Sequence, residues 1–313
     1  MARIVFLGTT DYSVPILEAL LVEHEVIAVI TQPDRPAGRG RRLTMPPVKT
    51  RALAADIPVF QPARLSRDQE TLAQLCDLAP DLFVLAAYGQ ILKPNVLAIP
   101  PHGTIGVHAS LLPRWRGAAP VAAAILNGDP ETGVTLMLTD EGMDTGPIIA
   151  QRSIPIGEKD TRESLTRKLS FLGADLLRET LPDWLAGRIR PVPQNDALAT
   201  YAPPLAKDAG RLDWSLPAVQ LARIVRACTP WPGAFLNWRS QRIRVIRAHP
   251  ESCPGESLPG TVISRGKTIG VATVDGILVL EQLQPPGKRP MTAIAFVSGR
   301  PGFVGSRLTV GQP

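Results

Sequence analysis

Short apolar runs alternate with helix-like segments in the first half of the chain. Residues 4–7 and 26–30 are predicted to form buried strands, and residues 14–21 carry apolar positions at helical spacing. Strands joined by a helix in this way usually pair in parallel through a right-handed crossover. Further strand-like runs follow at 81–87, 104–108, 134–139 and 148–156. We therefore expect an α/β fold whose N-terminal part is a doubly wound, mostly parallel sheet.

The pattern changes in the second half. Residues 161–185 predict one long amphipathic helix or two, with Pro182 ending the helix early, and residues 187–204 carry four prolines and resemble a semi-extended linker. A predicted helix at 218–227 then precedes short apolar runs separated by turn signals, at 243–246, 261–263, 269–274 and 277–280. This spacing favours a small C-terminal OB-like β-barrel. The expected division is a domain at 1–187, a linker at 188–208 and a second domain at 209–313.

Composition supports an ordinary globular protein. The 313 residues suffice for two domains, and the hydrophobic and charged contents are 44% and 20%. The three cysteines, Cys76, Cys228 and Cys253, are too widely spaced for a disulfide framework or a CxxC metal site. No apolar run approaches the roughly 18 residues of a membrane span, and no targeting signal precedes the first strand. We expect a cytoplasmic monomer that binds no metal.

Positive charge is concentrated in two regions. Residues 205–313 hold 14 Lys and Arg against 6 Asp and Glu, whereas residues 1–204 have a slight acidic excess. Residues 32–51 combine six basic residues with one acid among glycines and prolines, which predicts an exposed loop. Both regions could bind nucleic-acid phosphates, or they could be solvated surface. The arginines that we single out are Arg35, Arg39, Arg41 and Arg42 in the loop and Arg223 and Arg244 in the C-terminal part.

The most distinctive stretch is residues 104–117, a strand-like run that ends at His108 and breaks into a turn containing Pro113 and Gly117. Asp144 follows between two glycines, after another strand-like run. If both strands deliver these residues to one edge of the sheet, an imidazole and a carboxylate share a pocket. A single histidine near a strand end is more often structural than catalytic. The sequence lacks GxGxxG, GxxxxGK[ST], HExxH and GxSxG patterns, which argues against nucleotide, zinc and covalent-serine chemistry.

These residues carry a family resemblance. The run SLLPRWRGAAP at 110–120, with His108 before it and Asp144 in DEGMDTG after it, resembles the methionyl-tRNA formyltransferases. The segments FLGTTDYSVPIL, TQPDRPAGRGRR, VLAAYGQIL and WPGAFL extend the resemblance over nearly the whole chain. It implies a Rossmann-type formyltransferase domain that transfers a formyl group from 10-formyltetrahydrofolate to methionine on charged initiator tRNA, for translation initiation. His108 and Asp144 would be the catalytic residues.

The resemblance also implies binding residues. Tyr88 and Gly89 would help to line a folate pocket, and the arginine-rich loop would wedge against the tRNA acceptor stem. Residues 111–113 would offer apolar surface to the pteridine ring, and Ser110 a hydroxyl, although such a turn is also ordinary packing. The folate-binding residues expected in this way are Tyr88, Gly89, Ser110, Leu111, Leu112 and Pro113.

One position departs from the family. The family motif has an asparagine two residues before the histidine, whereas this chain has Gly106 there. A backbone N–H or a water held by His108, Ser110 or Thr135 could replace the missing amide donor. Two alternatives therefore stay open beside the tRNA-directed enzyme. One is a folate-dependent formyltransferase that acts on an amino sugar, and the other is a catalytically weakened RNA-binding relative.

Overall fold

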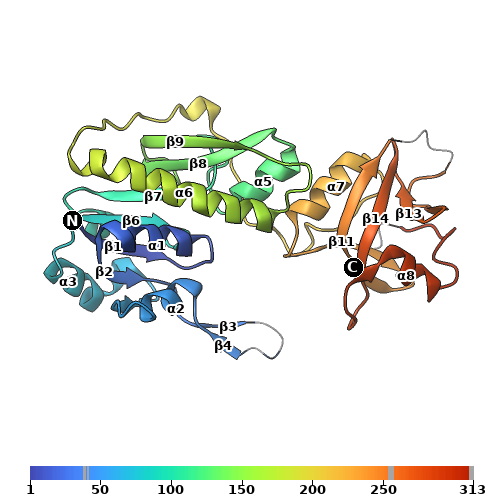
Figure 1. Cartoon of the computed structure of the whole chain (residues 1–313), viewed down its shortest axis with the longest axis horizontal. Helices are drawn as coiled ribbons and strands as arrows, with labels where there is room; N and C mark the ends of the chain where they lie inside the picture. Colours follow the sequence, from blue (N-terminus) through green and yellow to red (C-terminus); the bar gives the residue numbers. More distant parts are fainter. Residues whose placement is uncertain (38–39, 41, 253–256, 310–313) are drawn as a thin grey trace. The chain divides into compact units, whose positions relative to one another are not determined.

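The computed structural model describes residues 1–37, 40, 42–252 and 257–309, which form two compact units (Figure 1). Unit 1 consists of residues 1–120, 131–155 and 166–202, and unit 2 consists of residues 121–130, 156–165 and 203–313. Two short segments from the first half of the chain therefore belong to unit 2. The segment predicted as a linker is divided between the units after Ala202.

A seven-stranded sheet forms the centre of unit 1, in the order β5-β2-β1-β6-β7-β8-β9. Neighbours from β5 to β7 pair in parallel, which confirms the expected mostly parallel sheet, while β8 is antiparallel to both β7 and β9. Apolar side chains on one part of this sheet, among them Val5, Ile27 and Phe83, form a buried cluster. The strands are β1 (Arg3–Gly8), β2 (Glu25–Ile30), β5 (Val59–Phe60), β6 (Leu82–Ala86), β7 (Thr104–His108), β8 (Glu131–Leu138) and β9 (Ile148–Pro155).

Helices and short helical turns lie between these strands in the sequence or follow the last of them. The start of α3 has a clear local cause, because the Asp68 side chain accepts a hydrogen bond from the Thr71 N–H at 3.0 Å. The elements are α1 (Ser13–Glu23), α2 (Pro47–Leu53), η1 (Leu65–Arg67), α3 (Gln69–Asp77), α4 (Pro94–Leu97), α5 (Pro120–Asn127), α6 (Arg162–Leu185) and η2 (Asp196–Leu198).

The prediction that Pro182 ends the long helix was wrong, because α6 continues to Leu185. Pro182 lies in the last turn of α6, where its missing N–H costs the helix one hydrogen bond, the one to the Arg178 carbonyl oxygen, without ending it. The Ala186 N–H still bonds to the Pro182 carbonyl oxygen at 3.2 Å.

The loop predicted at 32–51 is more ordered than its composition suggests. Strands β3 (Arg35–Ala37) and β4 (Arg42–Thr44) pair as a hairpin, and α2 begins at Pro47, the first-turn position that suits proline. Lys49 forms an ion pair with Asp34 at 2.9 Å, which ties α2 to the start of the hairpin. Arg39 and Arg41 lie outside the described residues.

Unit 2 combines an antiparallel sheet with helices α7 and α8, and its bounds also include nearly all of α5. The predicted helix is confirmed as α7 (Ala218–Ala227), and a second helix is α8 (Ala293–Ser298). The expected closed OB-like barrel is not confirmed, because the sheet runs from β10 to β12 with no pairing between those two strands among the described residues. The strands, in the order β10-β11-β14-β13-β12 with β15 on β14, are β10 (Ala234–Trp238), β11 (Gln241–Glu251), β12 (Val262–Arg265), β13 (Thr268–Ala272), β14 (Ile277–Gln284) and β15 (Met291–Thr292).

Aromatic rings close the core of unit 2. Trp238, Phe296 and Phe303 contact one another edge-to-face, with ring centroids 5.0 to 6.4 Å apart.

Among the helices of the described residues, none is long and apolar enough to cross a membrane.

Candidate active site

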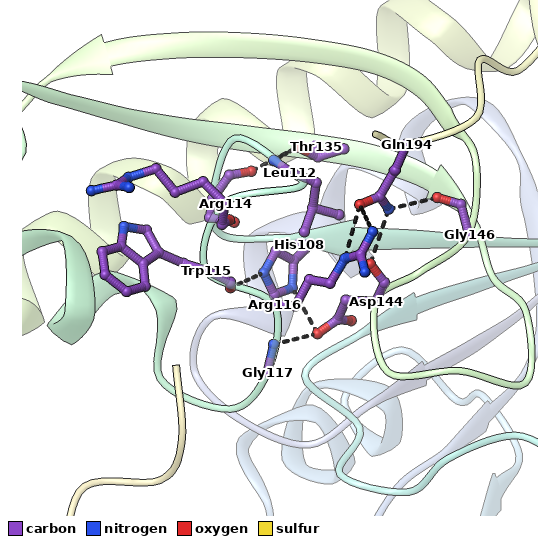
Figure 2. Close-up of polar contacts among 11 residues, drawn as sticks. His108, Leu112, Arg114, Trp115, Arg116, Gly117, Thr135, Asp144, Gly146 and Gln194 are labelled. Carbon is purple, nitrogen blue, oxygen red and sulfur yellow. Dashed lines mark hydrogen bonds and ion pairs between the residues drawn. The ribbon is translucent and has the colours of Figure 1, made fainter. Parts of the chain in front are cut away.

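His108 is the last residue of β7, and its side chain is only 9% exposed. Its Nε2 atom lies 3.0 Å from the backbone carbonyl oxygen of Trp115, and its Nδ1 atom faces Asp144 Oδ2 at 3.6 Å (Figure 2). A carbonyl oxygen can only accept a hydrogen bond, so Nε2 carries a proton in this arrangement. The imidazole is therefore held between a neutral acceptor and a carboxylate.

Asp144 reaches His108 by a route that the sequence did not predict. Because β8 is antiparallel to β7, the chain leaves β8 at the end of the sheet opposite His108. The segment that follows β8 then brings Asp144 back, with its backbone in the left-handed region at φ +56°. Its Oδ2 atom accepts a hydrogen bond from the Gly117 N–H at 2.8 Å. The expected pairing is present, but the assumption of two parallel strands behind it was wrong.

The Thr135 side chain holds the loop after His108 through hydrogen bonds to its backbone. The Thr135 hydroxyl donates to the Ser110 carbonyl oxygen at 2.7 Å and accepts from the Leu112 N–H and from Gln151 Nε2. The Ser110 hydroxyl donates to the Arg114 carbonyl oxygen at 2.6 Å. One donor and two acceptor positions saturate a threonine hydroxyl. Thr135 is therefore a support for the loop and has no free position for the water that was one possible replacement for the missing amide donor.

The residues expected to bind folate fall into two groups. Tyr88, Ser110 and Leu112 are buried, and burial raises the pKa of the Tyr88 hydroxyl, whose ring packs in the hydrophobic cluster of unit 1. Leu111 and Pro113 are partly exposed, and Gly89 is exposed. Only the second group presents side chains or backbone to a ligand in this conformation.

Gly89 lines an open cleft of about 420 Å³ whose walls are strongly basic. Arg35, from the segment expected to bind tRNA, lies on the same cleft, so the structure brings together two residues that the sequence assigned to different ligands. A carboxylate or phosphate would suit these walls. The cleft is lined by Gln32, Arg35, Ala63, Arg64, Ser66, Arg67, Gly89, Gln90, Ile91 and Lys93.

Gly106 lies in β7 opposite Met137 of β8. A Cβ atom at this position would lie 3.0 Å from both Met137 Cε and Thr139 Oγ1. The Thr139 hydroxyl is buried and has no hydrogen-bond partner among the described residues. A polar side chain at position 106 would therefore meet an unpaired hydroxyl and the flexible end of a methionine.

The other arginines expected to bind tRNA lie on different elements from His108. Arg42 is exposed on β4, and Arg35 Nη2 donates to Gln32 Oε1 at 3.0 Å. In unit 2, Arg223 on α7 places its guanidinium where a side chain on Gly128 would be, and Arg244 on β11 donates to the Pro230 carbonyl oxygen at 2.7 Å.

Comparison with known proteins decides the family. Residues 2–181 match the family described as formyl transferase, and residues 204–301 match its C-terminal domain. The methionyl-tRNA formyltransferase of Halorhodospira halophila is 51% identical over 100% of this chain and 99% of its own length. That of Roseiflexus castenholzii is 48% identical over 95% of this chain and 96% of its own length. The chain belongs to the methionyl-tRNA formyltransferase family.

Solved structures of two other proteins share the fold of this family member. An N-formyltransferase from Helicobacter canadensis, in complex with folinic acid and dTDP-3-aminofucose, has a TM-score of 0.68 at 19% identity and covers 91% of this chain and 100% of its own. HypX from Aquifex aeolicus, in complex with tetrahydrofolic acid, has a TM-score of 0.64 at 21% identity and covers 95% of this chain and 47% of its own.

The surroundings of His108 and Asp144 contain two residues for which the sequence predicted no role. Arg116, only 2% exposed, donates to Gln194 Oε1 from Nε and Nη2 and to Asp196 Oδ1 from Nη2. Burial alone would lower the pKa of the Arg116 guanidinium, but hydrogen bonds to Asp196 and Tyr201 outweigh it, so the pKa is raised. Arg116 belongs to the motif at residues 110–120. Gln194 belongs to the segment predicted as a linker, where no sequence pattern indicates a role for it.

Proposed function

We propose that this enzyme transfers the formyl group of 10-formyltetrahydrofolate to the amino group of methionine on charged initiator tRNA, at the start of translation. The observation that carries the proposal is the identity of 48–51% over almost the entire chain to proteins of that name. The sugar-directed alternative has support only from structures that are about 19% identical, which is a likeness of fold. We also expect the enzyme to act in the cytoplasm and as a monomer.

The reaction is an acyl transfer between two nitrogens. The neutral amine attacks the formyl carbon, a C–N bond forms, and negative charge develops on the formyl oxygen. The tetrahedral intermediate then collapses as the bond from carbon to the folate nitrogen breaks, and a proton moves from the attacking to the leaving nitrogen. The products are the formylated aminoacyl-tRNA and tetrahydrofolate.

His108 and Asp144 suit the proton movements of this reaction. The Nε2–H group of His108 is a donor that could turn from the Trp115 carbonyl oxygen to the formyl oxygen or to the leaving nitrogen. Asp144 orients the imidazole at 3.6 Å and can accept the amine proton, directly or through water. The pair needs no covalent intermediate. Among the described residues no group of three or more His, Cys, Asp or Glu side chains is placed to hold a metal ion.

Donor and acceptor would use different surfaces. We assign the pteridine ring of the folate to the partly exposed Leu111 and Pro113, while Tyr88, Ser110 and Leu112 support that wall from within. We assign tRNA phosphates to the arginines of the β3–β4 hairpin and to Arg223 and Arg244 of unit 2, in whose residues 205–313 Lys and Arg outnumber Asp and Glu.

A direct comparison of three acceptors tests the proposal. Purified full-length enzyme, 10-formyltetrahydrofolate and one of three acceptors are combined: charged initiator tRNA, charged elongator methionyl-tRNA or a nucleotide-linked amino sugar. We expect rapid formylation of the initiator tRNA and little of the others. Faster formylation of the sugar would support a formyltransferase that acts on amino sugars. Tight tRNA binding without any turnover would support an RNA-binding relative with weakened catalysis.

A further inference from the structure

The segment predicted as a linker takes part in the catalytic site. Val192 exchanges two backbone hydrogen bonds of 2.8 Å with Ile148, the first residue of β9. Further along, Thr200 accepts from the Arg116 N–H through its carbonyl oxygen and from the Trp115 N–H through its hydroxyl, each at 2.9 Å. Both ends of this segment, residues 192–202, are therefore fixed to elements of unit 1.

Gln194 lies in the middle of the segment and uses both ends of its amide (Figure 2). Its Nε2 atom donates to the carbonyl oxygens of Asp144 at 2.9 Å and Gly146 at 2.7 Å, while its Oε1 atom accepts from Arg116. A guanidinium can only donate and a carbonyl oxygen can only accept, so the amide has one possible orientation. No other uncharged side chain of the same length supplies this combination.

The two carbonyls that Gln194 holds belong to the turn that carries the catalytic carboxylate. Asp144 has φ +56°, a conformation that costs free energy for a residue with a side chain and persists only where its surroundings enforce it. Arg116 lies in the loop that also supplies the Trp115 carbonyl to His108 and the Gly117 N–H to Asp144. Gln194 thus joins the two loops that set both contacts of the imidazole.

We propose that Gln194 is a positioning residue: it fixes the turn at residues 144–146 against Arg116 and thereby sets the placement of the Asp144 carboxylate on His108. The proposal rests on the proposed formyl transfer for its kinetic readout. A carboxylate displaced by about 1 Å is sufficient to lower turnover by about 10²-fold, because proton transfer depends steeply on geometry.

The kinetic test uses Gln194→Leu and the shorter amide in Gln194→Asn, with Gln74→Leu on the exposed face of α3 as a matched control. We expect both Gln194 variants to lower kcat by about 10²-fold with little change in KM for donor or tRNA. We expect Gln74→Leu to leave both constants unchanged. A rise of KM by about 10²-fold with no change of kcat in the Gln194 variants would overturn the proposal.

A double variant separates positioning from general weakening of the fold. If Gln194 acts through Asp144, the two effects are not additive, and adding Gln194→Leu to Asp144→Asn should change kcat by no more than about twofold, which is the usual tolerance in such comparisons. A further loss of about 10²-fold in the double variant would show that Gln194 acts elsewhere, and the proposal would fail.

A readout without turnover covers the case in which the enzyme does not use tRNA. The imidazole resonances of His108, assigned with His108→Ala, should shift in the Gln194→Asn protein and stay in place in Gln74→Leu. Unshifted resonances in a folded Gln194→Asn protein would refute the positioning role. A wild-type protein without formyl transfer would refute the proposed function alone.

Discussion

Asp144 Oδ2 lies 3.6 Å from His108 Nδ1, and the same oxygen accepts the Gly117 N–H at 2.8 Å. One carboxylate oxygen therefore faces the imidazole and at the same time anchors the loop whose Trp115 carbonyl receives the opposite ring nitrogen. Both hydrogen-bonding positions of His108 depend on this one loop. Changes to the loop, to the residues around it and to the nearby charges therefore have specific expected effects.

Restoring the family asparagine in Gly106→Asn should raise turnover by at least about tenfold, because one amide donor to the developing oxyanion is worth about 10²- to 10³-fold in a preorganised site. The new Cβ atom would lie 3.0 Å from Met137 Cε, which can move, and the amide could pair with the Thr139 hydroxyl. Turnover at saturating folate and tRNA measures the effect. Gly106→Ala adds the same Cβ atom without the amide and should give no rise; an asparagine variant no faster than wild type would mean that this position hosts no donor.

The arginines of residues 32–51 should serve tRNA. Replacing Arg41 and Arg42 together with alanine should raise KM for tRNA and reduce the slope of log affinity against log salt, by about 0.9 for each duplex phosphate that the variant no longer neutralises. KM for the folate should stay the same. Arg178→Ala, which removes an arginine of α6 ion-paired with Asp175 at 3.6 Å, is the control for a general charge effect. Unaltered tRNA kinetics in the double variant would remove the hairpin from the tRNA surface.

Unit 2 should contribute tRNA affinity without contributing chemistry. A chain shortened near Arg188 is a poor test of this division, because it would delete Gln194 and Thr200 from unit 1. Substitution in the full chain avoids this problem. Arg223→Gln with Arg244→Gln should weaken tRNA binding, measured by filter binding over a salt series, and leave folate binding unchanged. Undiminished tRNA affinity would place the acceptor surface elsewhere.

Cys228 should take no part in the reaction. It is fully buried, and burial raises the pKa of its thiol to about 11 against a weaker opposing effect of Arg162. Because the thiolate is the nucleophile, and a raised pKa keeps the thiol protonated up to that pH, iodoacetamide at about pH 8 should spare Cys228 and modify the exposed Cys76. Peptide mass spectrometry reports both sites. Alkylation of Cys228 at the rate of Cys76, with loss of formyl transfer, would contradict a mechanism without a cysteine nucleophile.

Local patterns predicted much of the fold. The apolar run that ends at His108 became β7, and the helix at 218–227 was placed at its observed bounds, because burial on one strand or one helical face leaves a periodic signal. Strand direction leaves no such signal, so the antiparallel course of β8 could not be predicted. The β3–β4 hairpin escaped prediction because each strand has only three residues and the sequence between them is rich in glycine and arginine.

The site was predictable only in part for a similar reason. His108 and Asp144 stand in distinctive motifs, whereas Gln194 is a single polar residue among prolines, and its role depends on a fold that brings it to Arg116 and Asp144. Tyr88 stands next to a strand in a position that suits a ligand pocket, but its ring turns into the hydrophobic cluster.

The most direct test of the account measures formyl transfer to charged initiator tRNA at saturating donor and tRNA, for wild type, His108→Ala and Asp144→Asn. A positioned acid–base group typically contributes about 10²- to 10⁴-fold to the rate. We expect each variant to stay folded, to keep its tRNA affinity and to lose turnover by about 10²- to 10⁴-fold. Turnover within about twofold of wild type in either variant would contradict it.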